Sequence, residues 1–190
     1  TRSQVEMRYL GLKKEEIEVF RNMMSQILYL SPLRRKQESS IKGNRKGQPG
    51  LWAYGISGDF PIVAVFISRA EELDLVKELI KAHEYWRLKG LFVDVVIINE
   101  EESSYLRPLY NMLQDIISVS HARDMRDKAG GVTIKQGYSM PEEDKQLIAA
   151  AARIVLKGKY GPLSVQTKVR NGKNAFEYKI WKSKGKKHNK

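Results

Sequence analysis

Three short apolar runs constrain the fold of this chain more than any other feature of its sequence. The runs are Pro61–Ile67, Phe92–Ile98 and Val132–Lys135. A continuous apolar run of this length is typical of a strand that is buried on both faces of a parallel sheet. Each run is followed by a stretch with helical periodicity. This alternation predicts an α/β fold with a small three-stranded, mostly parallel sheet and right-handed crossover helices.

Three amphipathic stretches are expected to form the crossover helices. They run from Arg69 to Lys89, from Ser103 or Ser104 onward, and from Ser139 to about Leu156. Ser68 with Glu71, and Ser139 with Glu142, have the spacing of capping boxes at helix N-termini. The second helix has a predicted apolar stripe of Leu106, Leu109, Leu113, Ile116 and Ile117.

A further helix is expected before the first strand. The residues from Lys13 to Leu30 place apolar side chains on one face at helical spacing. The stretch Leu33–Gly50 is rich in Arg, Lys, Ser and Gly and has no periodicity, which predicts a long loop. We therefore divide the chain into an N-terminal helix with a basic loop (1–50), an α/β module (51–165) and a basic, irregular tail (166–190).

The positive charge of the chain lies mainly in two segments. A net charge of +12 over 190 residues invites a nucleic-acid partner. However, residues 166–190 hold nine Lys or Arg and one Glu, and residues 34–46 hold six Lys or Arg and one Glu. Charge that is confined to a loop and a tail is usually solvated, so the sequence disfavours nucleic-acid binding.

Length and composition narrow the class of protein. A chain of this size can bury a sizeable core, and the absence of cysteine excludes disulfides and thiolate metal sites. The longest apolar runs are too short for a membrane helix, and no signal peptide is visible. The lack of cysteine suits a reducing compartment, so we expect a cytoplasmic chain. Because it opens on Thr1 rather than Met, we also expect a fragment of a longer protein.

A glycine-rich segment, Gly55–Asp59, lies directly before the first predicted strand. Phosphate-binding loops instead follow a strand and open a helix, and the sequence contains neither a P-loop motif nor a GxSxG elbow. We therefore interpret the segment as a tight turn. In this turn Gly55 and Gly58 adopt positive φ, and Ser57 or Asp59 caps backbone amides.

The residues around this turn leave a second interpretation open. Trp52 and Tyr54 precede the turn and offer aromatic surfaces for stacking by a sugar or by a neighbouring domain. Ser57 and Asp59 would supply the polar contacts. We therefore keep Trp52, Tyr54, Ser57 and Asp59 as candidate ligand or interface residues.

Polar residues follow each predicted strand at its carboxyl end. These are Ser68, Asn99 and Gln136. Ligands of open parallel sheets bind at this edge, so the three residues form a second set of candidates. They lack a nucleophile paired with a base. The adjacent acids Glu100–Glu102 point in different directions, whereas a glycosidase needs two carboxyl groups that face each other. We therefore expect no catalytic residue here.

Two polar residues interrupt apolar segments. His83 lies on an apolar helix face without a second ligand one turn later, so we expect a buried histidine bonded to a backbone carbonyl or a carboxylate, and no metal. Asp94 lies within the second predicted strand. If it is buried it must be paired, for which Arg87 and Lys89 are candidates, or it faces solvent at an edge. Neither residue indicates a cofactor, and we expect none.

Five colinear segments are long or unusual enough to carry a resemblance to a known family. They are QPGLWAYGISGDFPIV at Gln48–Val63, AHEYWRLKGL at Ala82–Leu91 and VDVVIIN at Val93–Asn99, together with Gln4–Leu12 and Met140–Asp144. In their order along the chain, and over about residues 1–165, they resemble an internal segment of cyclic β-1,2-glucan synthases. No resemblance extends beyond residue 166.

The resemblance implies an activity for a parent enzyme rather than for this chain. Such synthases are large bacterial proteins, attached to the inner membrane, that join a glycosyltransferase using UDP-glucose to a phosphorylase-like region of glycoside hydrolase family ninety-four. The matching segment resembles a connector between two β-sandwich domains, and no catalytic residue of the family falls within it. We therefore expect a non-catalytic module whose partners are the other domains and, in addition, glucan. A carbohydrate- or nucleotide-sugar-binding domain is the alternative, and a basic nucleic-acid-binding protein is a third hypothesis.

Overall fold

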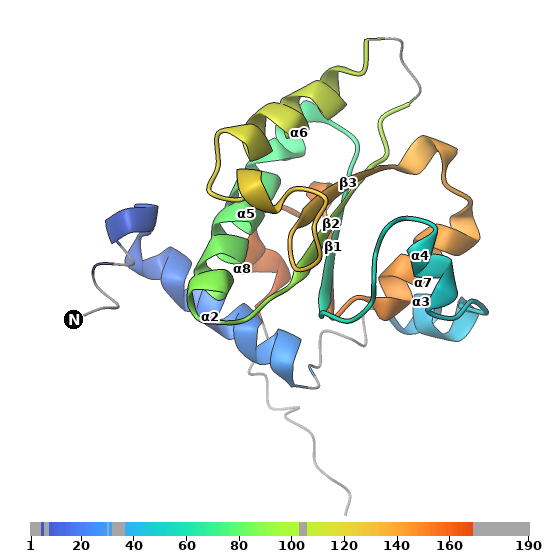
Figure 1. Cartoon of the computed structure of the whole chain (residues 1–190), viewed down its shortest axis with the longest axis horizontal. Helices are drawn as coiled ribbons and strands as arrows, with labels where there is room; N and C mark the ends of the chain where they lie inside the picture. Colours follow the sequence, from blue (N-terminus) through green and yellow to red (C-terminus); the bar gives the residue numbers. More distant parts are fainter. Residues whose placement is uncertain (1–4, 6–7, 30, 32–36, 103–105, 169–190) are drawn as a thin grey trace, which may run out of the picture.

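Four parallel strands form the sheet at the centre of the structure. The computed structural model describes residues 5, 8–29, 31, 37–102 and 106–168. The sheet has the order β3-β2-β1-β4, and Figure 1 labels β1, β2 and β3. Its strands are β1 (Ile62–Ile67), β2 (Asp94–Asn99), β3 (Val132–Gln136) and β4 (Ile154–Lys157). The predicted α/β class with a parallel sheet is therefore confirmed, but the sheet has one strand more than the three predicted.

Strand β4 lies where the sequence predicted that the last helix continues to about Leu156. Helix α7 (Glu142–Ala151) ends earlier, because Ala152 adopts extended backbone angles (φ −66°, ψ 143°). Ile154 then pairs with Val63 of β1, and β-branched residues fit such a pleated surface well. Four residues after an alanine-rich helix are too few to reveal the change of periodicity, so pairing with β1 decides the structure.

Helices cover both faces of the sheet (Figure 1). One face carries α2 (Lys14–Leu28), α5 (Leu73–Leu88), α6 (Pro108–Ser118) and α8 (Leu163–Gln166). The other face carries α3 (Glu38–Gly43), α4 (Pro49–Trp52) and α7. Short 3-10 helices lie at Ala70–Glu72, Arg123–Met125, Gly137–Ser139 and Gly158–Tyr160. The described residues therefore form three layers, α/β/α.

Successive strand residues point to opposite faces of the sheet, and both faces are covered. In β1, Val63 and Val65 belong to the core that includes α5, whereas Ile62 and Ala64 belong to the core that includes α7. This is the burial expected for a parallel sheet. The crossovers through α5 and α6 join β1 to β2 and β2 to β3, and both helices lie on one face. The crossover through α7 leads in the opposite direction, from β3 to β4, and its helix lies on the other face. All three crossovers therefore have the same handedness.

The segment Leu33–Gly50, predicted to be a long loop, contains two short helices. Both α3 and α4 contact α7. Leu51 in α4 belongs to the same core as Leu147, and Gly50 lies so close that an added Cβ would be 2.5 Å from Leu147 Cδ2. Helices this short gain their stability from tertiary contacts, which explains the missing periodicity. Residues 33–36 of this segment lie outside the described residues.

The helices α5 and α7 begin differently from the prediction. A 3-10 turn precedes α5, and the Ser68 backbone N–H donates to Glu72 Oε2 at 2.7 Å rather than to Glu71. The chain enters α7 through Pro141, while Ser139 lies in the preceding 3-10 turn. Neither predicted capping box therefore forms.

Helix α6 begins at Pro108. The predicted caps Ser103 and Ser104 lie outside the described residues. Three members of the predicted stripe are buried, namely Leu109, Leu113 and Ile117. Leu106 is 74% exposed, since it precedes the helix and does not continue the apolar face.

Helix α2 confirms the predicted N-terminal helix within two residues of each end. It contacts α5, where Trp86 Nε1 donates to the Phe20 carbonyl at 2.9 Å. Gln26 of α2 also donates from Nε2 to the carbonyl of Thr167, at 2.9 Å. Residues 169–190 of the predicted tail lie outside the described residues. Within the described ranges, no helix has the length and hydrophobicity that crossing a membrane requires.

Candidate functional site

The carboxyl edge of the sheet brings together the three residues predicted there. Asn99 pairs across the sheet with Ile67 and with Gln136, and Ser68 follows Ile67 directly. The Asn99 Nδ2 donates to Gln136 Oε1 at 3.3 Å, and Asn99 Oδ1 accepts the Glu101 backbone N–H at 2.9 Å. Asn99 thus fixes the loop that leaves β2. Ligand binding by Ser68, Asn99 and Gln136 stays a prediction.

A cavity of about 780 Å³ opens at this edge, between the ends of β1 and β4. Its lining includes Phe66, Ser68, Glu72, Lys145, Lys157 and Tyr160. Ser68 is the predicted residue that lines it, whereas Asn99 and Gln136 lie outside the lining. Of the three predicted residues at this edge, Ser68 therefore lies at the cavity.

Carboxylates organise the loops around this cavity. After β1, Glu72 accepts the Ser68 backbone N–H, as described above. After β2, Glu100 forms an ion pair with Lys145, with 3.3 Å between Lys145 Nζ and Glu100 Oε1. Glu101 accepts the Leu109 N–H at the start of α6, with 3.2 Å to each oxygen. A carboxylate is favourable at a helix N-terminus, where backbone N–H groups lack helical partners. The acidic residues at this edge therefore have structural partners.

The glycine-rich segment lies at the opposite, amino edge of the sheet. Gly55 and Gly58 have φ of 68° and 76°, which confirms the predicted positive values. The Ser57 hydroxyl accepts the Asp59 N–H at 3.2 Å, as expected for a capped turn. Trp52 Nε1 donates to the Ser57 carbonyl at 3.2 Å, although the Trp52 side chain remains 60% exposed. These bonds hold the segment as a turn.

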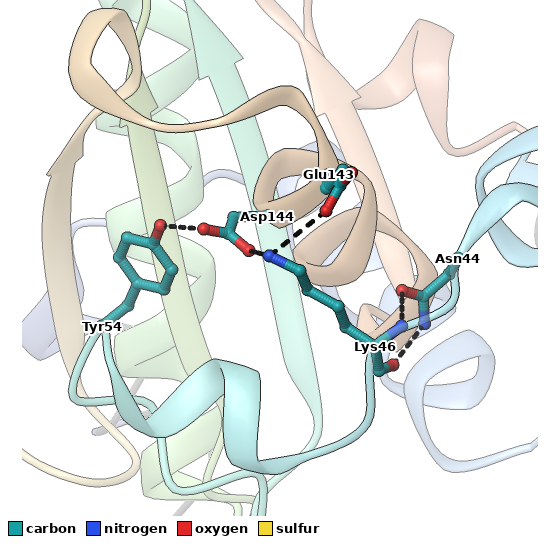
Figure 2. A network of polar contacts seen from close by, with 5 residues as sticks. All are labelled: Asn44, Lys46, Tyr54, Glu143 and Asp144. Atoms are coloured by element: carbon teal, nitrogen blue, oxygen red, sulfur yellow. Dashed lines mark hydrogen bonds and ion pairs between the residues drawn. The ribbon is translucent and has the colours of Figure 1, made fainter.

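A polar network ties this turn to helix α7. Figure 2 shows Tyr54 and Lys46 on either side of Asp144. The Tyr54 hydroxyl and the Lys46 ammonium each donate to one Asp144 oxygen, the second at 2.5 Å. Lys46 Nζ also lies 3.5 Å from Glu143 Oε2. The Asn44 side chain donates to the Lys46 carbonyl through Nδ2 and accepts the Lys46 N–H through Oδ1. The segment between α3 and β1 is thereby fastened to the first turn of α7.

The network changes the acidity of its members. The hydrogen bond from Lys46, followed by that from Tyr54, lowers the pKa of the Asp144 carboxyl. Burial, followed by the bond to Asp144, raises the pKa of Tyr54. The bond to Asp144 also raises the pKa of Lys46. Each shift favours the protonation state that keeps the network intact at neutral pH, so the three groups act as a structural unit rather than as an acid–base pair.

A second polar contact, at the start of β2 and β3, joins α5 to the loop before β3. His83, only 1% exposed, donates from Nε2 to the Gly130 carbonyl at 2.9 Å, which confirms the predicted backbone partner. Asp94 is buried, as one of the two predicted alternatives required, and its Oδ1 accepts the Gly130 N–H at 2.6 Å. Burial lowers the pKa of His83 and raises the pKa of Asp94.

Across the ranges that the structure describes, no group of three or more His, Cys, Asp or Glu residues is placed to hold a metal ion. His83 instead bonds the Gly130 carbonyl, and the charged partner of Glu84 is Arg87, at 2.9 Å.

A curated relative matches most of the chain. The cyclic beta-(1,2)-glucan synthase NdvB of Rhizobium meliloti (strain 1021) is 31% identical over 168 residues, which are 87% of this chain. This chain resembles a segment of that synthase. The match spans 6% of the length of NdvB, so most of NdvB has no counterpart here. No family model matches the chain.

Sequence reasoning missed the β4 side of the cavity. Lys157, Gly158 and Tyr160 line it, and they follow a strand that was not predicted. The run Ile154–Leu156, placed between an alanine-rich helix and a glycine, was the available signal. Asp144 was missed as well, because its partner Lys46 is distant in sequence and only the fold brings the two together.

Proposed function

We propose that this chain acts as a non-catalytic α/β module of a carbohydrate-active enzyme related to cyclic β-1,2-glucan synthase. The similarity to a segment of NdvB over 87% of the chain supports this proposal. The parent activity would be glucosyl transfer and glucan phosphorolysis, performed by domains outside the matched segment. In this proposal the α/β module gives those domains a rigid connection.

One observation supports a structural role most strongly. The inward-facing titratable side chains hold loops in place: His83 and Asp94 bond the two backbone groups of Gly130, and Asp144 joins Lys46 to Tyr54. A general acid or base must instead be within reach of a substrate proton. Groups whose hydrogen bonds close the fold are suited to stability rather than to turnover.

The proposed partners are the other domains of the parent enzyme, with glucan as an additional ligand. We propose that the module lies on the cytoplasmic side of an enzyme attached to the bacterial inner membrane. Trp52, 60% exposed beside a fixed turn, is the proposed contact with a neighbouring domain, while Tyr54, Ser57 and Asp59 position that turn.

An activity assay tests the non-catalytic role. The purified 190-residue chain is incubated with UDP-glucose and, separately, with linear β-1,2-glucan and inorganic phosphate. We expect no release of UDP or glucose 1-phosphate above a heat-denatured control, whereas a full-length synthase in the same assay releases both. Turnover by the chain alone would contradict the proposal.

The second candidate function is a carbohydrate- or nucleotide-sugar-binding domain. The cavity of about 780 Å³ at the carboxyl edge favours it, because ligands of open α/β sheets bind at that edge. Titration with β-1,2-glucooligosaccharides and with UDP-glucose, monitored by amide chemical shifts, tests it. Unchanged shifts at Ser68, Asn99 and Gln136, and along the cavity, would exclude this function.

A further inference from the structure

The cavity at the carboxyl edge lies where the strand order reverses. From β1 the chain crosses to β2 and then β3 on one side, whereas β4 lies on the other side of β1. The connections that leave β1 and β4 lead to α5 and α8 on one face of the sheet, and residues of α7 line the crevice from the other face. The volume of about 780 Å³ falls within the range of roughly 300 to 1,000 Å³ that is common for small-molecule sites.

The loop after β1 is unsuited to a phosphate group. Phosphate sites of this topology use a glycine-rich turn and free N–H groups at the following helix N-terminus. Here the loop Ser68–Glu72 contains no glycine, and the Glu72 carboxylate already accepts the Ser68 N–H at 2.7 Å. A phosphate would have to displace this carboxylate and would meet like charge, which disfavours the pyrophosphate of a nucleotide sugar.

Glu72 is also held in place from the side of β4. A Cβ added to Gly158 would lie 2.3 Å from Glu72 Oε2 and 2.4 Å from its Cδ. The Glu72 side chain therefore fills the space that a larger residue at 158 would need. This close packing fixes a carboxylate in the cavity wall at the point where β1 and β4 meet.

The charged side chains of the lining are balanced in number, and aliphatic residues such as Val155 and Val165 lie beside them. Three glutamates and three lysines line the cavity, together with amide and hydroxyl side chains such as Gln146 and Ser39. Lys145 and Glu100 neutralise each other at 3.3 Å. Such a lining presents both hydrogen-bond donors and acceptors, and its formal charges sum to zero. This suits a neutral ligand with many hydroxyl groups.

Aromatic surface is present in the same cavity. Tyr160 lines it from the turn after β4 and is 57% exposed, with Lys159 Nζ 5.1 Å from its ring centre. Phe66 lines it from β1. The tyrosine ring offers a flat apolar face together with a polar hydroxyl at its tip. The C–H face of a pyranose packs on such a ring while its hydroxyls reach the surrounding polar groups.

We propose that this crevice binds a neutral gluco-oligosaccharide, and that it does not bind the nucleotide sugar. Tyr160 provides the stacking surface, and Glu72 with the amide and lysine side chains binds sugar hydroxyls. This assignment rests on the proposed function, in that glucan is the ligand chemistry of the related synthase. It narrows the second candidate function to one ligand class and one position in the fold.

Chemical-shift titration of the isotope-labelled 190-residue chain tests the assignment. The probes are linear β-1,2-glucooligosaccharides, UDP-glucose and inorganic phosphate. We expect saturable shifts for the amides of Ser68, Lys157 and Tyr160 with the oligosaccharides only. Equal or larger shifts at these amides with UDP-glucose or phosphate would overturn the choice of a neutral ligand, and unchanged amides with every probe would overturn the site.

Matched tyrosine variants test the stacking role. Tyr160→Ala is expected to raise the Kd for the oligosaccharide about fivefold, which is typical for the loss of one aromatic contact. Tyr160→Phe keeps the ring and should stay close to the parent value. Tyr138→Ala is the control, since Tyr138 is also exposed but lies outside the cavity lining. Equal Kd values for Tyr160→Ala and Tyr138→Ala would overturn the role of Tyr160.

The same samples separate this inference from the proposed function. Release of UDP or glucose 1-phosphate during the titration would contradict the non-catalytic role but leave the binding site in place. Unchanged amides, without turnover, would remove the binding site but leave the structural module intact.

Discussion

The two edges of the sheet differ in how their polar residues are used. At the amino edge, Asp94 and His83 bond the two backbone groups of Gly130 and so fix the loop before β3. At the carboxyl edge, Glu72 and Lys145 also have partners, but they line an open cavity. The difference indicates that the amino edge stabilises the fold, whereas the carboxyl edge combines a stable frame with accessible polar surface.

The largest effect is expected from Gly131→Ala at the amino edge. An added Cβ would lie 1.8 Å from the Met125 carbonyl oxygen, which is backbone and cannot rotate away. We expect a loss of about 3 kcal/mol or more in the free energy of unfolding, measured by urea denaturation. Gly43→Ala is the control, because its Cβ would meet Gln146 Oε1 at 3.4 Å, an ordinary contact. Equal stability of the two variants would contradict the rigid amino edge.

A smaller loss is expected from Gly158→Ala at the carboxyl edge. Here the neighbour is the side chain of Glu72 rather than backbone, so we expect a loss of about 2 kcal/mol. Adding Glu72→Ala should recover part of it, since the contacts with the Glu72 carboxyl group disappear while the one with its Cβ, at 2.6 Å, remains. Additive losses in this double-mutant cycle would show that the two residues do not interact as described.

The sequence predicts the framework of the fold better than it predicts the cavity. Long periodic segments such as α2 and α5, and apolar runs such as β1, carry their own signals. Strand β4 and helix α3 are short and depend on packing against β1 and α7, which no local pattern reveals. The cavity needs β4, so Ser68 was recognised while Lys157 and Tyr160 were not.

A pH-dependent effect is expected from His83. Its folded-state pKa lies below the ordinary value of 6.5, so the unfolded chain binds a proton more readily. The stability associated with neutral His83 is therefore present above pH 6.5 and is lost as the pH falls toward the lower folded-state pKa. His83→Gln should flatten this decline in urea unfolding and cost about 1.5 kcal/mol at neutral pH, through the weakened bond to Gly130.

The exposed histidine provides the comparison for this variant. His121→Gln is the matched control, because His121 lies at the surface. If His83→Gln kept the full acid-induced loss of stability, the buried imidazole would not be its source.

The smallest effect is expected from Tyr54→Phe in the network of Figure 2. Removing the hydroxyl deletes one hydrogen bond to Asp144, while the bond from Lys46 remains. We expect a loss of about 1 kcal/mol in urea unfolding. Tyr138→Phe, at a half-exposed tyrosine, should change stability less. A larger effect at Tyr138 than at Tyr54 would argue against a stabilising role of the network.

The contrast between the edges is tested most directly by one amide chemical-shift map of the whole chain with linear β-1,2-glucooligosaccharides. We predict that saturable shifts gather at Ser68, Lys157 and Tyr160, while Trp52 and Asp59 at the amino edge stay unchanged. Shifts that gather at Trp52 and Asp59, with none around the cavity, would contradict the assignment of the carboxyl edge as the ligand-binding edge.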